Sequence, residues 1–140
     1  MNPIIKSILV MVLAIVTGSI VNMAFIYLGP MVIPNPAGTD LTTEVGLTAA
    51  MPLMQPKHFI FPFLAHALGT LSGSYIAVRF SDNRKLIKAL IIGVVFLIGG
   101  IQMVMILPSP LWFNLIDLTV AYVPFSLLGY LMAGGKNNHV

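Results

Sequence analysis

The residues best suited to chemistry lie in stretches that are otherwise apolar. Five polar side chains interrupt those stretches: Asn22, His66, Gln102, Asn114 and Asp117, with Ser19, Thr70 and Tyr122 as weaker members. Asp117 is the only acid among them, and a charged group at mid-depth in a bilayer costs about 2.5–3.5 kcal/mol even on the mildest insertion scale. Asp117 must therefore face the interior of a helix bundle, water or a partner, or carry a proton. Paired with His66, it would accept and donate a proton near neutral pH, or bind a cation or polar headgroup.

Composition places these residues in a membrane-embedded chain. Of the 140 residues, 58% are hydrophobic and 8% are charged, whereas a soluble globular protein has about 25% charged residues. So few charges cannot solvate a folded surface, which excludes a soluble domain, a disordered tail and a nucleic-acid binder. The chain has no cysteine, which also excludes disulfides, thiolate metal sites and a cysteine nucleophile.

The charged residues leave four apolar stretches that are long enough to cross a bilayer. They cover about residues 7–28, 58–80, 86–107 and 111–133, each near the roughly 20 residues that span about 30 Å of hydrocarbon. We therefore predict an all-α integral membrane protein. Residues 1–140 are expected to form a single bundle of four transmembrane helices, with a tail at 134–140.

The basic residues predict the orientation of the bundle. With the amino terminus inside, one side of the membrane receives Lys6, Arg79, Arg84, Lys85, Lys88 and Lys136, and the other receives Lys57. The positive-inside rule then places both termini in the cytoplasm. We expect an integral protein of a bacterial inner (plasma) membrane, with anionic lipid as a partner at the inner rim and no nucleic acid.

A long outer loop, residues 29–57, joins the first two spans and contains a predicted short helix. Asp40 suits its N-cap, Glu44 suits the dipole of its first turn, and the stretch from Leu41 to Met51 has no interior proline. We expect this helix to lie at the outer interface. Glu44 and His58 are candidates for the lid or entrance of a pocket, although an ordinary interface position is the favoured explanation for each.

Depth brings the polar residues to one level. Asn22, Gln102 and Asp117 each lie five or six residues from the outer end of their span, which is about 8–9 Å at 1.5 Å per residue. His66 reaches that level if its regular helix begins at Pro62. We therefore predict a polar pocket in the outer half, lined by the five residues named first. The alternative is that Asn22, Gln102 and Asn114 form hydrogen bonds between helices.

The last span carries its own pattern. Asn114, Asp117, Ala121 and Pro124 fall on one helical stripe, which we expect to face inward. Pro124 lacks an N–H group, so the carbonyl of Val120 loses its partner and the helix is expected to kink below Asp117.

Small residues predict where helices approach closely. The second span has one every four residues, at Ala65, Gly69, Gly73 and Ala77, and the first span has Ala14 and Gly18. Two interpretations stay open, packing within the chain and a homo-oligomer seam through the Gly69/Gly73 face.

No motif identifies a reaction or a cofactor. Several methionines near the outer side, together with His58 and His66, suggest a copper(I) site. No spacing typical of copper ligands brings them together, so we interpret the methionines as packing residues and predict no cofactor. The first functional hypothesis is a membrane protein that binds or passes a small molecule, lipid headgroup or ion. The alternatives are an accessory or assembly subunit of a larger complex, and a small intramembrane enzyme with His66 and Asp117 as acid–base groups on a lipid-like substrate.

Overall fold

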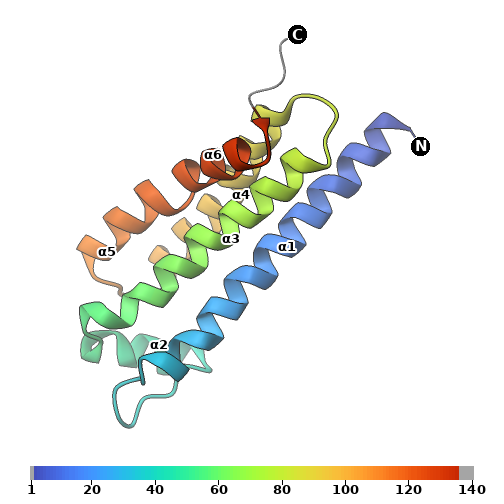
Figure 1. Ribbon diagram of the computed structural model, residues 1–140. Coiled ribbons are helices and arrows are strands. Elements are labelled where there is room, and N and C mark those ends of the chain that lie inside the picture. Colours follow the sequence, from blue (N-terminus) through green and yellow to red (C-terminus); the bar gives the residue numbers. More distant parts are fainter. Residues whose placement is uncertain (1, 136–140) are drawn as a thin grey trace.

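The structure, a computed structural model, describes residues 2–135, and the regular secondary structure of these residues is all helical, with no strand (Figure 1). Four helical stretches are long and apolar enough to cross a membrane. They are α1 (Pro3–Val32), a 3₁₀ turn η2 (Pro56–Phe59) that continues into α3 (Ile60–Arg79), α4 (Lys85–Ile106), and the series α5 (Leu111–Ile116), η3 (Asp117–Ala121) and α6 (Val123–Met132). The prediction of an all-helical chain with four membrane-length helices is confirmed. Lys136 and most of the predicted tail lie outside the described residues.

The first helix is longer than the apolar stretch that predicts it. Asn2 is its N-cap, with a side chain that accepts a hydrogen bond from the backbone N–H of Ile4 at 2.8 Å, and Pro3 occupies the first helical position. Proline is favoured there because the N–H that it lacks has no partner inside the helix. At the other end Pro30 falls in the last turn, where it removes one backbone hydrogen bond and the helix ends soon after.

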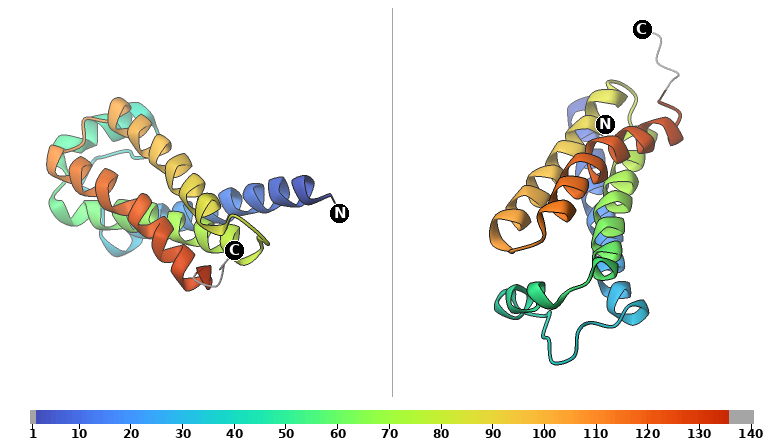
Figure 2. Two further views of the ribbon diagram at one scale, coloured as in Figure 1. Left: turned by 90° about the horizontal axis from the view of Figure 1, so that it is seen from above. Right: turned by 90° about the vertical axis from the view of Figure 1, so that its left-hand side faces the viewer.

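Helix α3 is the centre of the bundle and packs against α1, α4 and α6, whereas α1 makes most of its contact with α3 (Figures 1 and 2). Glycines allow α1 and α3 to touch through their backbones. A Cβ atom added at Gly69 would lie 2.9 Å from the carbonyl oxygen of Gly18, and one added at Gly73 would lie 2.9 Å from that of Ala14. The Gly69/Gly73 face is therefore covered by the chain's own first helix.

The opposite side of α3 is equally close to α6. Ser74 Oγ donates a hydrogen bond to the carbonyl oxygen of Ser126 at 2.6 Å, and both serines are fully buried. A Cβ atom added at Gly129 would lie 2.5 Å from the carbonyl oxygen of Leu71. Small and hydroxylated residues thus set the spacing between these helices, as is typical of helix pairs in membranes.

Residues 33–59 fold across one end of the bundle, which we call the loop end (Figure 2). They include the short helix α2 (Glu44–Ala50) and the 3₁₀ turn η1 (Met51–Leu53). Thr43, rather than Asp40, is the N-cap of α2, because its side chain accepts from the N–H of Gly46. Asp40 instead closes a turn by accepting from the N–H and hydroxyl of Thr42, and these hydrogen bonds lower its pKa.

An apolar cluster fixes this segment to the bundle. Met51, Phe59, Leu107 and Phe113 are buried against one another, with Leu47 of α2 packed beside them. Trp112 and Phe59 also make a T-shaped contact, with ring centroids 5.6 Å apart. The loop end is therefore a packed cap rather than an open connection.

The amino terminus, the turn at residues 80–84 and residues 133–135 lie together at the other end, which we call the terminal end (Figure 1). Lys6 Nζ donates to Asp82 Oδ2 at 2.5 Å and so ties α1 to the turn that follows α3. The hydrogen bond from Lys6 and its positive charge lower the pKa of Asp82.

Candidate functional site

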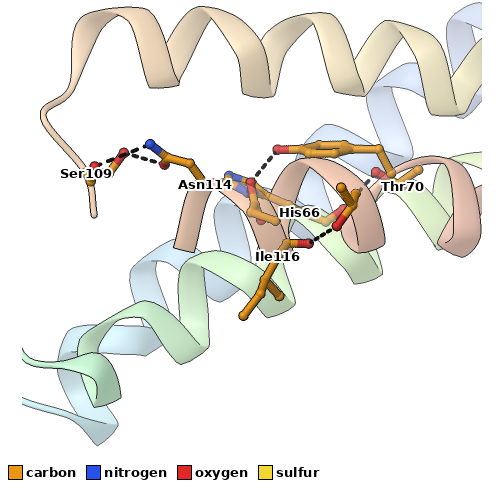
Figure 3. Close-up of polar contacts among 8 residues, drawn as sticks. His66, Thr70, Ser109, Asn114 and Ile116 are labelled. Atoms are coloured by element: carbon orange, nitrogen blue, oxygen red, sulfur yellow. Dashed lines mark hydrogen bonds and ion pairs between the residues drawn. The ribbon is translucent and has the colours of Figure 1, made fainter. Parts of the chain in front are cut away.

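The side chains of His66 and Asp117 meet between α3 and the fourth helical stretch (Figure 3). His66 Nδ1 lies 2.8 Å from Oδ1 and 2.9 Å from Oδ2 of Asp117. The Asp117 side chain is 3% exposed, whereas that of His66 is 19% exposed. The carboxylate is thus enclosed by the chain, and the imidazole lies between it and the surroundings.

Tyr122 completes a cluster of three polar side chains. Its hydroxyl donates to Asp117 Oδ2 at 3.0 Å, and its ring stacks on that of His66 with centroids 5.6 Å apart and planes 26° apart. Tyr122 is only 1% exposed. Two donors therefore converge on one buried carboxylate, and the pairing compensates part of the cost of burying its charge.

Asp117 and Tyr122 can share this contact because the helix changes its winding between them. In an α-helix two residues five positions apart point about 140° away from each other. The segment from Asp117 to Ala121 is π-helical. A π-helix has wider turns with hydrogen bonds between residues five apart, so the two side chains come closer to the same side. Single π-turns inside α-helices are frequent at functional sites.

A glycine on α4 makes room for the tyrosine. A Cβ atom added at Gly100 would overlap the Tyr122 hydroxyl and would lie 2.5 Å from Cζ of the same ring. Real Cβ atoms essentially never approach so closely. The backbone of α4 therefore forms the wall against which the phenol of Tyr122 rests.

The hydrogen bonds indicate which atom of the cluster is available for chemistry. When Asp117 is ionised it can only accept, and His66 Nδ1 then carries the proton of their hydrogen bond. In a neutral imidazole this leaves Nε2 with a free lone pair, and Nε2 has no hydrogen-bond partner among residues 2–135. Asp117 thus fixes the tautomer and the orientation of His66, as a carboxylate does in acid–base and metal-binding sites.

The other three predicted pocket residues do not join the pair. Asn114 bonds within the turn before α5, where it accepts from Ser109 Oγ at 2.6 Å and donates to the Ser109 carbonyl at 3.3 Å. Gln102 is exposed on α4. Asn22 is half-buried on α1 beside Gly69, one turn of α3 away from His66. Of the five, the structure brings together His66 and Asp117.

The two proposed entrance residues are both in the segment that covers the loop end. His58 links two parts of it, since Nδ1 accepts from the N–H of Gln55 at 2.9 Å and Nε2 lies 3.2 Å from the carbonyl oxygen of Pro34. Glu44 is exposed in the first turn of α2. His58 therefore closes the loop on itself.

Comparisons with protein-family models, with curated proteins and with solved structures gave no match for this chain. Its functional interpretation rests on its own geometry. Within residues 2–135 no group of three or more His, Cys, Asp or Glu side chains gathers as a metal site would require. The strongest chemical feature is the cluster of His66, Asp117 and Tyr122.

From the sequence, Tyr122 is predicted only as a weaker member of the site, and Gly100 is not predicted to contribute to it. A tyrosine in an apolar helix predicts a buried hydrogen bond, because a buried hydroxyl needs a partner. The position of that partner could not be read from the sequence, because an α-helical period sends residues 117 and 122 to different faces.

Proposed function

We propose that this chain is an integral membrane protein with both termini in the cytoplasm, and that it binds a small polar molecule, a lipid headgroup or an ion at the His66–Asp117–Tyr122 cluster. One observation carries the proposal. His66 is held by a buried carboxylate through Nδ1, while Nε2 has no partner in the described chain and the side chain keeps 19% of its surface exposed.

Membrane depth makes the free nitrogen significant. Asp117 lies six residues after the start of α5, or about 9 Å below the loop end at 1.5 Å per residue. At that depth an unpaired polar atom is costly, so a donor from outside the chain stabilises it. In the proposed orientation the cluster faces the outer leaflet, where headgroups and external solutes are within reach.

Charge indicates the kind of ligand. With His66 neutral, the cluster carries one negative charge on a nearly buried carboxylate. A ligand that brings a positive charge or a hydrogen-bond donor to Nε2 removes this imbalance. The favoured ligands are therefore a small cation or an ammonium-bearing headgroup.

The first test asks whether the free nitrogen can be reached. Diethyl pyrocarbonate modifies unprotonated imidazole nitrogens, and peptide mass mapping reports each histidine separately. In membranes that contain the protein, we expect His66 to be modified. The denatured protein is the reference, because both ring nitrogens of His58 are engaged within the loop. If His66 is modified only after denaturation, the cluster is closed to external molecules and the proposal fails.

The second test asks what the cluster retains. Native mass spectrometry of gently extracted protein should show a bound small molecule that is lost in both Asp117→Asn and His66→Ala. The matched control is Gln102→Ala, because Gln102 is a polar residue exposed outside the cluster. A bound mass that persists in both cluster variants contradicts the proposal. An accessory subunit is favoured instead if the two cluster variants retain the small molecule as the wild type does but unfold more easily or lose a partner protein.

The same geometry supports a second candidate, a small intramembrane enzyme. A carboxylate that orients an imidazole and leaves Nε2 free is the arrangement of a general acid–base pair. This function requires turnover of a lipid-like substrate. Turnover that disappears in both His66→Ala and Asp117→Asn would establish it, whereas binding without turnover would leave the first function.

A further inference from the structure

A groove with a basic mouth and apolar walls lies at the terminal end, far from the His66 cluster. Its volume is about 400 Å³ and it is formed between the start of α1 and the end of α3 with its following turn. Its polar lining is Lys6, Arg79 and Asp82, and its apolar lining includes Leu9, Leu13 and Phe80. From this arrangement we propose that the groove binds a single anionic phospholipid of the inner leaflet through its phosphate group.

Charge supports an anion with one negative charge. Lys6 and Arg79 are positive and Asp82 is negative, so the mouth of the groove carries one net positive charge. Lys6 is held in place by its 2.5 Å contact with Asp82, whereas Arg79 is exposed and has no ion pair among residues 2–135. Arg79 is therefore the cation available to a phosphate diester, and a guanidinium can donate two parallel hydrogen bonds to it.

The apolar walls support a lipid rather than a soluble anion. Lys6, Leu9 and Leu13 follow one face of α1 at helical spacing. Leu9 is 55% exposed, Leu13 is 48% exposed and Phe80 is 52% exposed. From Lys6 to Leu13 the helix rises about 10 Å, so an acyl chain can lie along α1 while its phosphate stays at the mouth.

The position of the groove agrees with the charge pattern of the chain. In the proposed orientation the terminal end faces the cytoplasm, where bilayers carry anionic lipid. The inference depends on insertion in a membrane, but it does not depend on the His66–Asp117–Tyr122 cluster. His66→Ala should therefore leave phosphatidylglycerol binding at the groove unchanged, and the two proposals can fail separately.

The experiment measures lipid binding to purified protein in detergent by native mass spectrometry. Dioleoyl phosphatidylglycerol is compared with dioleoyl phosphatidylcholine, which has the same chains and no net charge. We expect the anionic lipid to bind more tightly, and Arg79→Gln to weaken it about fivefold, the effect of one basic residue near a membrane surface. The control is Arg84→Gln, at an exposed cation of the same end that does not line the groove.

A gain of affinity separates the proposal from misfolding. Asp82→Asn raises the net charge of the mouth by one, so it should tighten phosphatidylglycerol binding about fivefold. Three results would overturn the proposal: equal affinity for both lipids, an equal loss in Arg84→Gln and Arg79→Gln, or weaker binding in Asp82→Asn. Displacement of the lipid by millimolar glycerol 3-phosphate would show a site for soluble anions and would also overturn it.

Discussion

Gly100→Ala tests how the cluster is assembled. The added methyl group would overlap the hydroxyl of Tyr122 and lie 2.5 Å from Cζ and 2.9 Å from Cε2. Ordinary carbon contacts are about 3.5–4.0 Å, so the ring or α4 must shift by about 1 Å. A shift of that size lengthens the 3.0 Å contact between the Tyr122 hydroxyl and Asp117 beyond hydrogen-bond range.

The expected magnitude follows from opposing terms. Overpacking a buried site destabilises by about 1–3 kcal/mol, and a lost interhelical or intrahelical polar contact in a membrane chain adds about 0.6 kcal/mol. The gain in helix propensity from glycine to alanine offsets about 0.5–1 kcal/mol. We therefore expect Gly100→Ala to be about 0.6–3 kcal/mol less stable than the wild type. Gly99→Ala is the matched control, because a Cβ atom added there meets nothing within 4 Å.

The assay is reversible unfolding in mixed micelles, followed by circular dichroism and by the fluorescence of Trp112, the single tryptophan. Equal stability of Gly100→Ala and Gly99→Ala would contradict the contact between Gly100 and the Tyr122 ring. Tyr122→Phe adds a second check, because removing the hydroxyl removes part of the overlap. The double variant should be less destabilised than the sum of the two single ones.

Two further predictions concern helix packing and pH. Ser74→Ala removes the buried hydrogen bond to Ser126 and should lower the free energy of unfolding by about 0.6–1.7 kcal/mol. The control Ser72→Ala loses only a hydrogen bond within α3, so its loss should be about 0.6 kcal/mol or less. Equal losses in the two variants would contradict an interhelical role for Ser74. The pKa of Asp82 is lowered from its ordinary value of 3.8, so the Lys6–Asp82 pair stabilises the fold at pH values above 3.8. This contribution is lost as the pH falls through the lowered pKa. Unfolding midpoints of the wild type and Asp82→Asn should therefore differ at pH 5 to 7 and converge once the pH falls below the lowered pKa of Asp82. A difference that grows on acidification would contradict the assignment.

The helices were predictable because long gaps between charges leave few alternatives. Their ends depended on local caps, which hydropathy does not register. Asn2 with Pro3 starts α1 before the predicted span, and Thr43 replaces Asp40 as the N-cap of α2 because the Asp40 side chain is engaged by Thr42. Insertion and the cytoplasmic position of the termini stay predictions from the distribution of lysine and arginine.

The candidate site was predictable only in part, for two physical reasons. His66 and Asp117 were expected at one depth, and they meet. Gln102 lies on a helix that is apolar on all sides, so no periodicity shows which side faces the bundle, and the structure leaves it exposed. The stripe predicted from Asn114 to Pro124 assumed a regular α-helix, and the π-helical turn moves Pro124 to an exposed position while Asp117 stays buried.

The π-helical turn also has a consequence for comparing sequences. Such a turn holds one residue more than an α-helical turn, so residues 117–121 are equivalent to an α-helix with a single insertion. A chain of the same fold that lacks this residue would rotate everything after it by about 100° and would carry the Tyr122 ring away from the carboxylate. A one-residue gap at this point in an alignment therefore distinguishes chains that keep the three-residue cluster from chains that share only the bundle.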